Sequence, residues 1–153
     1  MAAVGGGRQW DETSFFEDAK EKLKDDDVKA IRKVYEAAKQ FADLIAWGRG
    51  KGLGSLNPKV HAICKTKSLF SITSNGELAL NYYWLNDDDF TIQCGALLKK
   101  RLTVIPPLRT AIEKSNKKYP TIPISAWKPY TEQFIKVLQE YVDECRKLGP
   151  NHD

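Results

Sequence analysis

Residues 67–84 have the sequence KSLFSITSNGELALNYYW, which contains the clearest fold signal in the chain. Asn75-Gly76 lies between two runs rich in β-branched and aromatic residues, and this pattern predicts a β-hairpin. The loop length decides which side chains share a face, because a slip of one residue moves a whole strand's pattern to the other side. Gly76 favours a three-residue loop, since a type I turn followed by a residue with positive φ suits glycine at this place.

The three-residue loop also gives the cleaner division between apolar and polar faces. It places Ile72 opposite Leu78. Two residues further along, it places Phe70 opposite Leu80. One face of the predicted hairpin then carries Phe70, Ile72, Leu78, Leu80, Tyr82 and Trp84. This face must be covered, because leaving it in water would cost on the order of 10 kcal/mol, at about 1.5–3 kcal/mol for each large side chain.

Two N-terminal helices are predicted ahead of the hairpin. The first begins after Asp11 and has acids in its first turn, where the helix dipole favours them. The second begins at residues 25–27, three aspartates that offer an N-cap. Its apolar stripe comprises Val28, Ile31, Tyr35, Ala38, Ala42 and Ile45. We expect this long second helix to cover the apolar face of the hairpin.

Two further strands are expected between the helices and the hairpin. The first covers residues 43–48 and leads into a glycine-rich loop, residues 48–55. The second covers residues 59–64, where apolar side chains recur with a period of two. Together with the hairpin, these strands predict a four-stranded antiparallel meander.

Helical segments are expected after the hairpin. Residues 87–89, three further aspartates, can cap a third helix, and a short helix is expected over residues 108–114. Residues 119–124 must be extended, because each proline disfavours the α region for the residue before it. An apolar stripe predicts a terminal helix over residues 131–147. The fold class is therefore α+β: two N-terminal helices, a four-stranded antiparallel sheet with a central Asn-Gly hairpin, and C-terminal helices.

Length and composition indicate one globular domain. The chain has 153 residues, of which 42% are hydrophobic and 29% are charged. We expect residues 1–10 to form a flexible leader and residues 11–149 to form a single α+β domain. The N-terminus lacks the features of a signal peptide, and no apolar run approaches the roughly 18 residues of a membrane span. Three widely spaced cysteines favour reduced thiols, so a soluble cytoplasmic protein without membrane contact is expected.

The basic residues are unevenly distributed. The net charge is +4, yet residues 44–76 contain no acid at all. The cations of this stretch are Arg49, Lys51, Lys59, Lys65 and Lys67. Such an asymmetry indicates an anionic partner, either nucleic acid or an acidic protein.

The candidate nucleic-acid-binding residues combine these cations with aromatic and imidazole side chains. Aromatic rings can stack on bases while lysine and arginine contact phosphates. The set comprises Trp47, Arg49, Lys51, Lys59, His61, Lys65, Lys67 and Tyr83. The structural alternative is that the tryptophans belong to the core and that the lysines only solvate and protect a sheet edge.

No cofactor, metal site or catalytic residue follows from the sequence. Residues 48–55 fit neither glycine-rich phosphate fingerprint, so a mobile strand connection is the better interpretation. His61 and Cys64 point to opposite faces of the predicted strand and cannot share a metal. Asp43 or Glu77 keeps open a metal-dependent, nuclease-type hydrolase, although the lysine expected after Glu77 is missing. A protein–protein interaction domain is the third class that remains open.

Several short motifs follow one another in a definite order along the chain. They are Trp10 and Phe15, Trp47-Gly48-Arg49-Gly50, Gly54-Ser55, Leu69-Phe70, Asn75-Gly76 and Tyr119-Pro120-Thr121-Ile122-Pro123-Ile124. This order resembles an uncharacterised bacterial family of conserved domains, whose members occur alone or appended to nuclease-like or restriction-type domains. The resemblance implies an accessory role associated with nucleic acid and supplies no catalytic residue. The expected function is a small binding or accessory module, with nucleic acid as its first ligand class.

Overall fold

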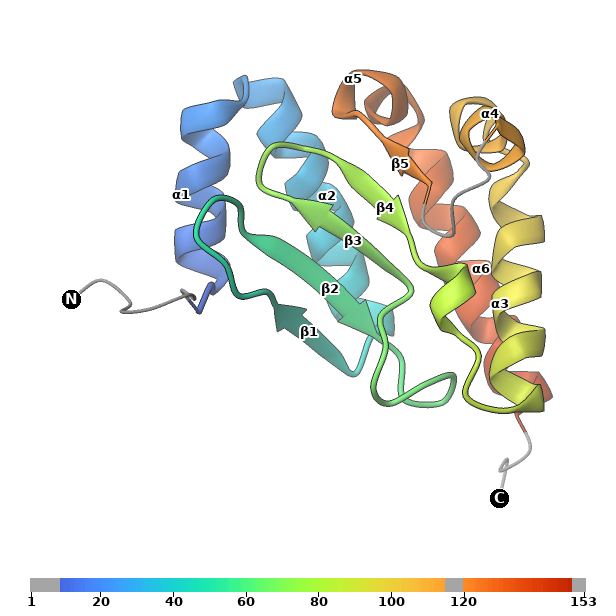
Figure 1. The fold of residues 1–153 in the computed structure, drawn as a ribbon. Helices are drawn as coiled ribbons and strands as arrows, with labels where there is room; N and C mark the ends of the chain where they lie inside the picture. The colour runs from blue at the N-terminus through green and yellow to red at the C-terminus, as the bar shows by residue number, and fades with distance from the viewer. Residues whose placement is uncertain (1–8, 115–119, 150–153) are drawn as a thin grey trace.

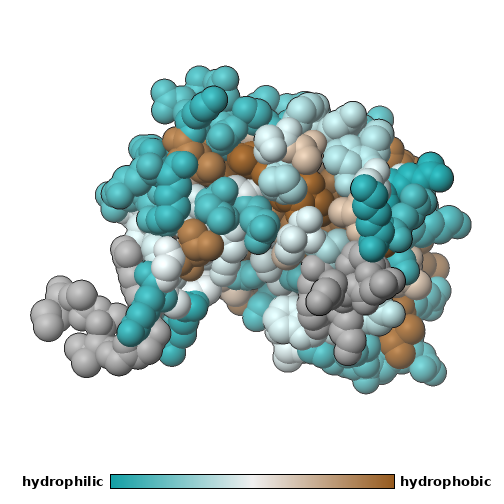
Figure 2. All heavy atoms as spheres, turned by 45° about the horizontal axis from the view of Figure 1, so that its top comes forward, coloured by the Kyte–Doolittle hydropathy of each residue, from teal (hydrophilic) through white to brown (hydrophobic). Residues whose placement is uncertain are grey.

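The computed structural model describes residues 9–114 and 120–149. The elements are α1 (Glu12–Lys22), α2 (Asp25–Phe41), β1 (Leu44–Trp47), β2 (Ser55–Lys59), β3 (Phe70–Thr73), β4 (Leu78–Leu80), η1 (Tyr82–Trp84), α3 (Asp89–Leu102), α4 (Pro106–Lys114), β5 (Thr121–Ile122), α5 (Ile124–Trp127), η2 (Lys128–Tyr130) and α6 (Thr131–Leu148). None of these helices is long and apolar enough to cross a bilayer. Figure 2 shows apolar side chains reaching the surface in separate places among hydrophilic ones.

Five antiparallel strands form one sheet in the order β1-β2-β3-β4-β5. The α+β class and the helices before and after the sheet are confirmed. The predicted number of four strands is wrong, because β5 pairs with β4 and places Ile122 opposite Leu78. The prolines around β5 predict an extended chain, and such a chain beside a sheet edge satisfies its backbone groups by pairing with that edge.

The central hairpin has the predicted register. Ile72 lies opposite Leu78. Phe70 lies opposite Leu80. Gly76 has a φ of 90°, and its N–H donates a 2.8 Å hydrogen bond to the carbonyl of the last residue of β3. The three-residue loop with glycine at the positive-φ position is thus confirmed.

Trp84 lies outside the buried face, contrary to the prediction. β4 ends at Leu80, and Asn81 leaves the extended conformation with a φ of −105° and a ψ of 21°. The chain then forms η1, so the alternation of buried and exposed side chains ends with the strand. Tyr82 is buried, whereas Trp84 is 44% exposed.

The second predicted strand is misplaced by several residues. β2 is Ser55–Lys59, and the following residues form a turn in which the N–H groups of Ile63 and Cys64 donate to the carbonyl of Val60. Val60, Ile63 and Cys64 are all buried. Their spacing of three and four residues is typical of a helical turn, whereas the period-two pattern used for the prediction counts the exposed Ala62 as an inward position.

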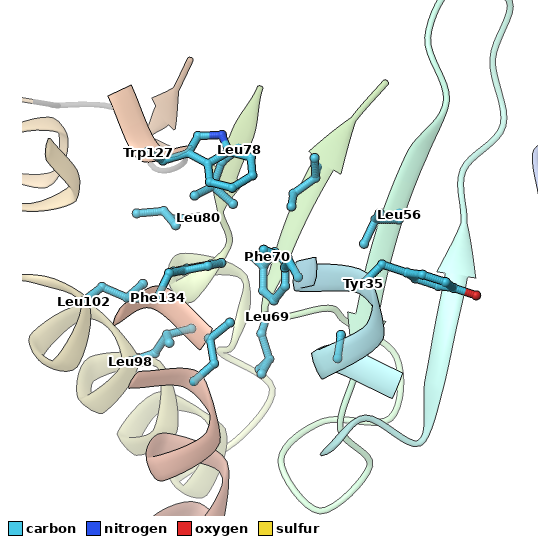
Figure 3. Close-up of a cluster of buried hydrophobic side chains, with 14 of the residues drawn as sticks. Tyr35, Leu56, Leu69, Phe70, Leu78, Leu80, Leu98, Leu102, Trp127 and Phe134 are labelled. Carbon is cyan, nitrogen blue, oxygen red and sulfur yellow. The ribbon is translucent and has the colours of Figure 1, made fainter. Parts of the chain in front are cut away.

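The helices pack on one face of the sheet, and the face toward the viewer in Figure 1 carries no helix of the described chain. Phe70 packs edge-to-face on Phe134 of α6, with ring centroids 5.3 Å apart. The indole N–H of Trp127 donates to the carbonyl of Gly76 at 2.8 Å. Figure 3 shows Phe70, Phe134 and Trp127 in one cluster with leucines of β4 and α3. The helix α2 therefore covers the sheet together with α5 and α6 rather than alone.

The aspartates of residues 25–27 lie in the first turn of α2, and Lys24 occupies the N-cap without a side-chain hydrogen bond. The predicted aspartate cap of α2 is therefore wrong. Asp88 does cap α3, through a capping box with Thr91. Acids in a first helical turn still stabilise α2, because the helix dipole favours negative charge there.

Trp10 is hydrogen-bonded to the glycine-rich loop between β1 and β2. The backbone N–H of Trp10 donates to the carbonyl of Gly48 at 3.1 Å, and its indole N–H donates to the carbonyl of Gly50 at 3.0 Å. Trp10 is only 2% exposed, so this residue of the expected leader packs in the core. Residues 1–8 lie outside the described part. These two hydrogen bonds attach the start of the loop to the body, and the mobility that its composition predicts stays a prediction.

Gly54→Ala should destabilise the fold, because a Cβ at this position would lie 2.7 Å from the ring of Trp10. We expect a loss of about 1–3 kcal/mol in the free energy of unfolding, the range typical of overpacked cores. Urea unfolding measures this loss. Gly52→Ala is the matched control, since a Cβ there meets nothing within 4 Å. Equal stabilities of the two variants would contradict the packing role of Gly54.

Candidate functional site

The open face of the sheet is built from small, mostly polar side chains. Because side chains alternate along a strand, the residues between the buried ones point to this face. They include Ser55 and Asn57 of β2, Ser71 and Thr73 of β3, Ala79 of β4 and Thr121 of β5. Their small size leaves the backbone of the central strands near the surface.

A row of hydrogen bonds crosses this face. Nδ2 of Asn57 donates to the carbonyl of Ala46 at 2.9 Å, and Oδ1 of Asn57 accepts from the hydroxyl of Ser71 at 2.5 Å. Nδ2 of Asn81 donates to Oγ of Ser71 at 3.1 Å and to Oγ of Ser68 at 3.0 Å. We call Asn57, Ser71 and Asn81 the polar row. Because each member binds its neighbours, the hydroxyl and amide groups are held in fixed positions.

Cations lie at both ends of the strands that carry the polar row. Arg49 and Lys51 lie in the loop between β1 and β2. Lys59 ends β2 at the opposite end, and Lys65 follows in the loop to β3. Within residues 9–114 and 120–149, none of these four takes part in an ion pair. The Nε of Arg49 donates to Oε1 of Gln9 at 3.1 Å.

His61 and Lys65 line a polar pocket of about 420 Å³ between the loop after β2 and the start of α3. The backbone N–H of His61 donates to Oδ2 of Asp43 at 2.7 Å. Cys64 also lines this pocket, and its thiol donates to Oδ2 of Asp87 at 3.4 Å. The pocket thus contains both cationic and acidic groups, which do not select one sign of ligand charge.

The side chain of Lys67 binds neighbouring side chains of the protein itself. Its ammonium lies 2.6 Å from Oδ1 of Asp87, and it donates to Oδ1 of Asn86 at 3.2 Å. The hydrogen bond from Lys67, assisted by one from Cys64, lowers the pKa of the Asp87 carboxyl. This pairing holds the loop before β3 against the start of α3. A direct contact of Lys67 with nucleic acid stays a prediction.

The two aromatic residues of the predicted set lie in different surroundings. The ring of Trp47 packs against those of Phe15 and Tyr35, each with centroids 5.6 Å away. Tyr35 donates to Oε1 of Glu12 at 2.8 Å, and burial together with this hydrogen bond raises the pKa of Tyr35 to about 12. Trp47 therefore belongs to an aromatic cluster on the helical side of the sheet. Tyr83, by contrast, is 52% exposed in η1.

Asp43 and Glu77 lie at opposite ends of the sheet. The N–H of Asp43 donates to the carbonyl of Lys59 at 2.9 Å, at the end of β2. The carbonyl of Glu77 accepts from the N–H of Thr73, which lies opposite Ser55 at the start of β2. In the described part of the chain, no three histidine, cysteine, aspartate or glutamate side chains are grouped so that they could hold a metal ion.

The polar row is missing from the residues that the sequence singles out. The sequence does contain a pattern that indicates it. Asn57 follows Leu56 and Ser71 precedes Ile72, and these two apolar residues are buried opposite each other in β2 and β3. This pattern is not recognised when the second strand is predicted at residues 59–64 instead of Ser55–Lys59. With the strand at residues 59–64, Asn57 falls in a loop and has no partner across the sheet.

Comparison with protein-family models, curated proteins and solved structures finds no match to this chain. The open face, its polar row and the cations beside it are the features of the molecule that indicate a function. The likeness to a bacterial domain family stays an expectation from the motifs.

Lys67→Gln should raise the pKa of Asp87 toward its ordinary value, because the hydrogen bond from Lys67 is the largest cause of the lowering. In the unmodified protein, the pKa of Asp87 is lower in the folded state than in the unfolded state. The interaction therefore stabilises the fold above the unfolded pKa of about 3.9 and is lost as pH falls through the folded pKa. Carbon-13 NMR titration of the carboxyl groups measures the shift. Lys65→Gln is the control, and identical Asp87 titrations in both variants would contradict the pairing.

Proposed function

We propose that this protein binds single-stranded nucleic acid across the open face of the sheet, mainly through the sugar-phosphate backbone. The observation that carries this proposal is the position of the polar row between two pairs of cations that have no ion-pair partner in the described chain. Lysine and arginine at both ends would meet phosphates. The amide and hydroxyl protons of the polar row are already donated within the protein, whereas the oxygens of Asn57 and Ser71 can still accept from sugar hydroxyls.

The dimensions of the face support a short ligand segment. The two cationic ends are separated by β2, which has five residues. At about 3.3 Å for each residue, the separation is roughly 17 Å, which a few nucleotides of an extended strand can span. No helix of the described chain protrudes from this face to enter a duplex groove, so a flexible single strand fits it better than a duplex.

The side chains of the face favour backbone contacts over base recognition. Apart from Lys59 at the end of β2, the residues that point outward from the central strands are serine, threonine, asparagine and alanine, and the Trp47 ring packs on the helical side. Binding of this kind depends little on base sequence and strongly on salt. A small accessory module that holds a strand near another activity would need such properties, in line with the role that the motif resemblance implies.

Removing the four cations should weaken binding to an oligonucleotide of about 20 nucleotides by more than about tenfold at low salt. The variant is Arg49→Gln, Lys51→Gln, Lys59→Gln and Lys65→Gln. Its plot of log affinity against log salt should become shallower by about 0.7 for each lost phosphate contact on a single strand. Fluorescence anisotropy across a salt series measures both quantities.

The matched control removes four charges from exposed positions of the helical side. It carries Lys20→Gln, Lys24→Gln, Lys29→Gln and Lys136→Gln, and it should keep both the affinity and the salt slope. An equal loss in the two variants would mean that only net charge matters, which contradicts the site. Absence of binding by the unmodified protein at low salt rejects the proposal. Binding of polyglutamate instead of the oligonucleotide would identify an acidic protein as the partner.

A further inference from the structure

A second pocket lies beside the open face, between η1 and α3, and has a volume of about 280 Å³. Its walls include the rings of Tyr82 and Tyr83, whose centroids are 6.0 Å apart, and the side chain of Ile92. Tyr83 and Ile92 are each 52% exposed. The pocket is therefore an apolar slot that is open to solvent and small enough for one flat group rather than for a large ligand.

The walls of this slot are held in place by close backbone packing. A Cβ at Gly95 of α3 would lie 2.5 Å from the carbonyl oxygen of Tyr82. The absence of that atom lets η1 approach α3 directly. The slot is therefore formed before any ligand enters, which reduces the cost of binding.

The polar groups at the slot favour an aromatic ligand that carries a negative charge. Nζ of Lys99 lies 5.7 Å from the centroid of the Tyr82 ring and has no ion-pair partner in the described chain. Asn86 also lines the slot, and its Oδ1 accepts from Lys67. Aromatic and aliphatic walls beside an ammonium fit a base with a neighbouring phosphate.

We propose that this slot receives one unstacked base of a bound single strand, with an adjacent phosphate at Lys99. The inference rests on the proposed function and adds a subsite to it. The two surfaces are neighbours, because β4, whose Ala79 points to the open face, is joined to η1 by Asn81 alone, a buried residue that binds Ser71. A strand that runs off the open face past the end of β4 would meet the exposed Tyr83 next.

Free nucleotides test the slot separately from the open face. At millimolar concentration, adenosine monophosphate should shift the NMR amide signals of Tyr83, Ile92 and Lys99, whereas ribose phosphate, which lacks the base, should not. Ile92→Glu should abolish these shifts, because it places a charge in the apolar wall. Val104→Glu is the matched control, since Val104 is an aliphatic residue outside the slot with a similar exposure of 58%.

Oligonucleotides test whether a bound strand uses the slot. Ile92→Glu should weaken binding about tenfold, within the range that one stacked base contributes, and Val104→Glu should not. Lys99→Gln should weaken binding more than Lys100→Gln, its neighbour on the same helix. Amide spectra of each variant establish that the fold is intact.

Each outcome decides between the two proposals. Unchanged signals of the slot residues with adenosine monophosphate would overturn the inference. Oligonucleotide binding that survives Ile92→Glu would also overturn it, while the proposed function would stand. Nucleotide shifts without oligonucleotide binding would reject the proposed function and, with it, the inference of a strand-bound base, and would identify the slot as a site for free nucleotides instead. Shifts caused only by an acidic peptide with an aromatic residue would overturn the inference in favour of a protein partner.

Discussion

The burial of one face of the central hairpin is the constraint on which the rest of this structure depends. Phe70 packs on Phe134 of α6, and the indole of Trp127 holds the carbonyl of Gly76. Large buried side chains such as these stabilise the fold by about 1.5–3 kcal/mol each. Because side chains alternate along a strand, burying this set places Ser71 and its neighbours on the opposite, open face. The polar row is thus a direct consequence of the packing beneath it.

The cationic ends of the open face are held by contacts elsewhere in the fold. At one end, Trp10 binds the loop that carries Arg49 and packs against Gly54. At the other end, the pairing of Lys67 with Asp87 holds the loop that contains Lys65. Anchored loops lose less conformational freedom when a ligand binds, so a modest number of charges can be effective. In the same way, the close approach of η1 to α3 at Gly95 fixes the walls of the slot beside Tyr83 before a ligand binds.

Sequence patterns predict the local elements of this protein well and its long-range contacts poorly. Asn75-Gly76 predicts the hairpin, its register and its loop, since turn chemistry is local. The position of β2 is not predicted, because Pro58 lies in a strand whose pairing with β1 and β3 depends on distant residues. The exposure of Trp84 is missed for a related reason: the strand ends where η1 meets Gly95, a contact between separate parts of the chain.

The sequence by itself determined the α+β class, the helices α1, α2, α3, α4 and α6, and the acid-free basic stretch, because periodicity and charge are properties of neighbouring residues. Only the tertiary structure decided which cations have no ion-pair partner among the described residues, that Trp47 joins an aromatic cluster, and that Asn57, Ser71 and Asn81 meet in one row. These features depend on contacts between residues far apart in the chain. Such contacts form only when burial of the hydrophobic core selects one arrangement of the elements.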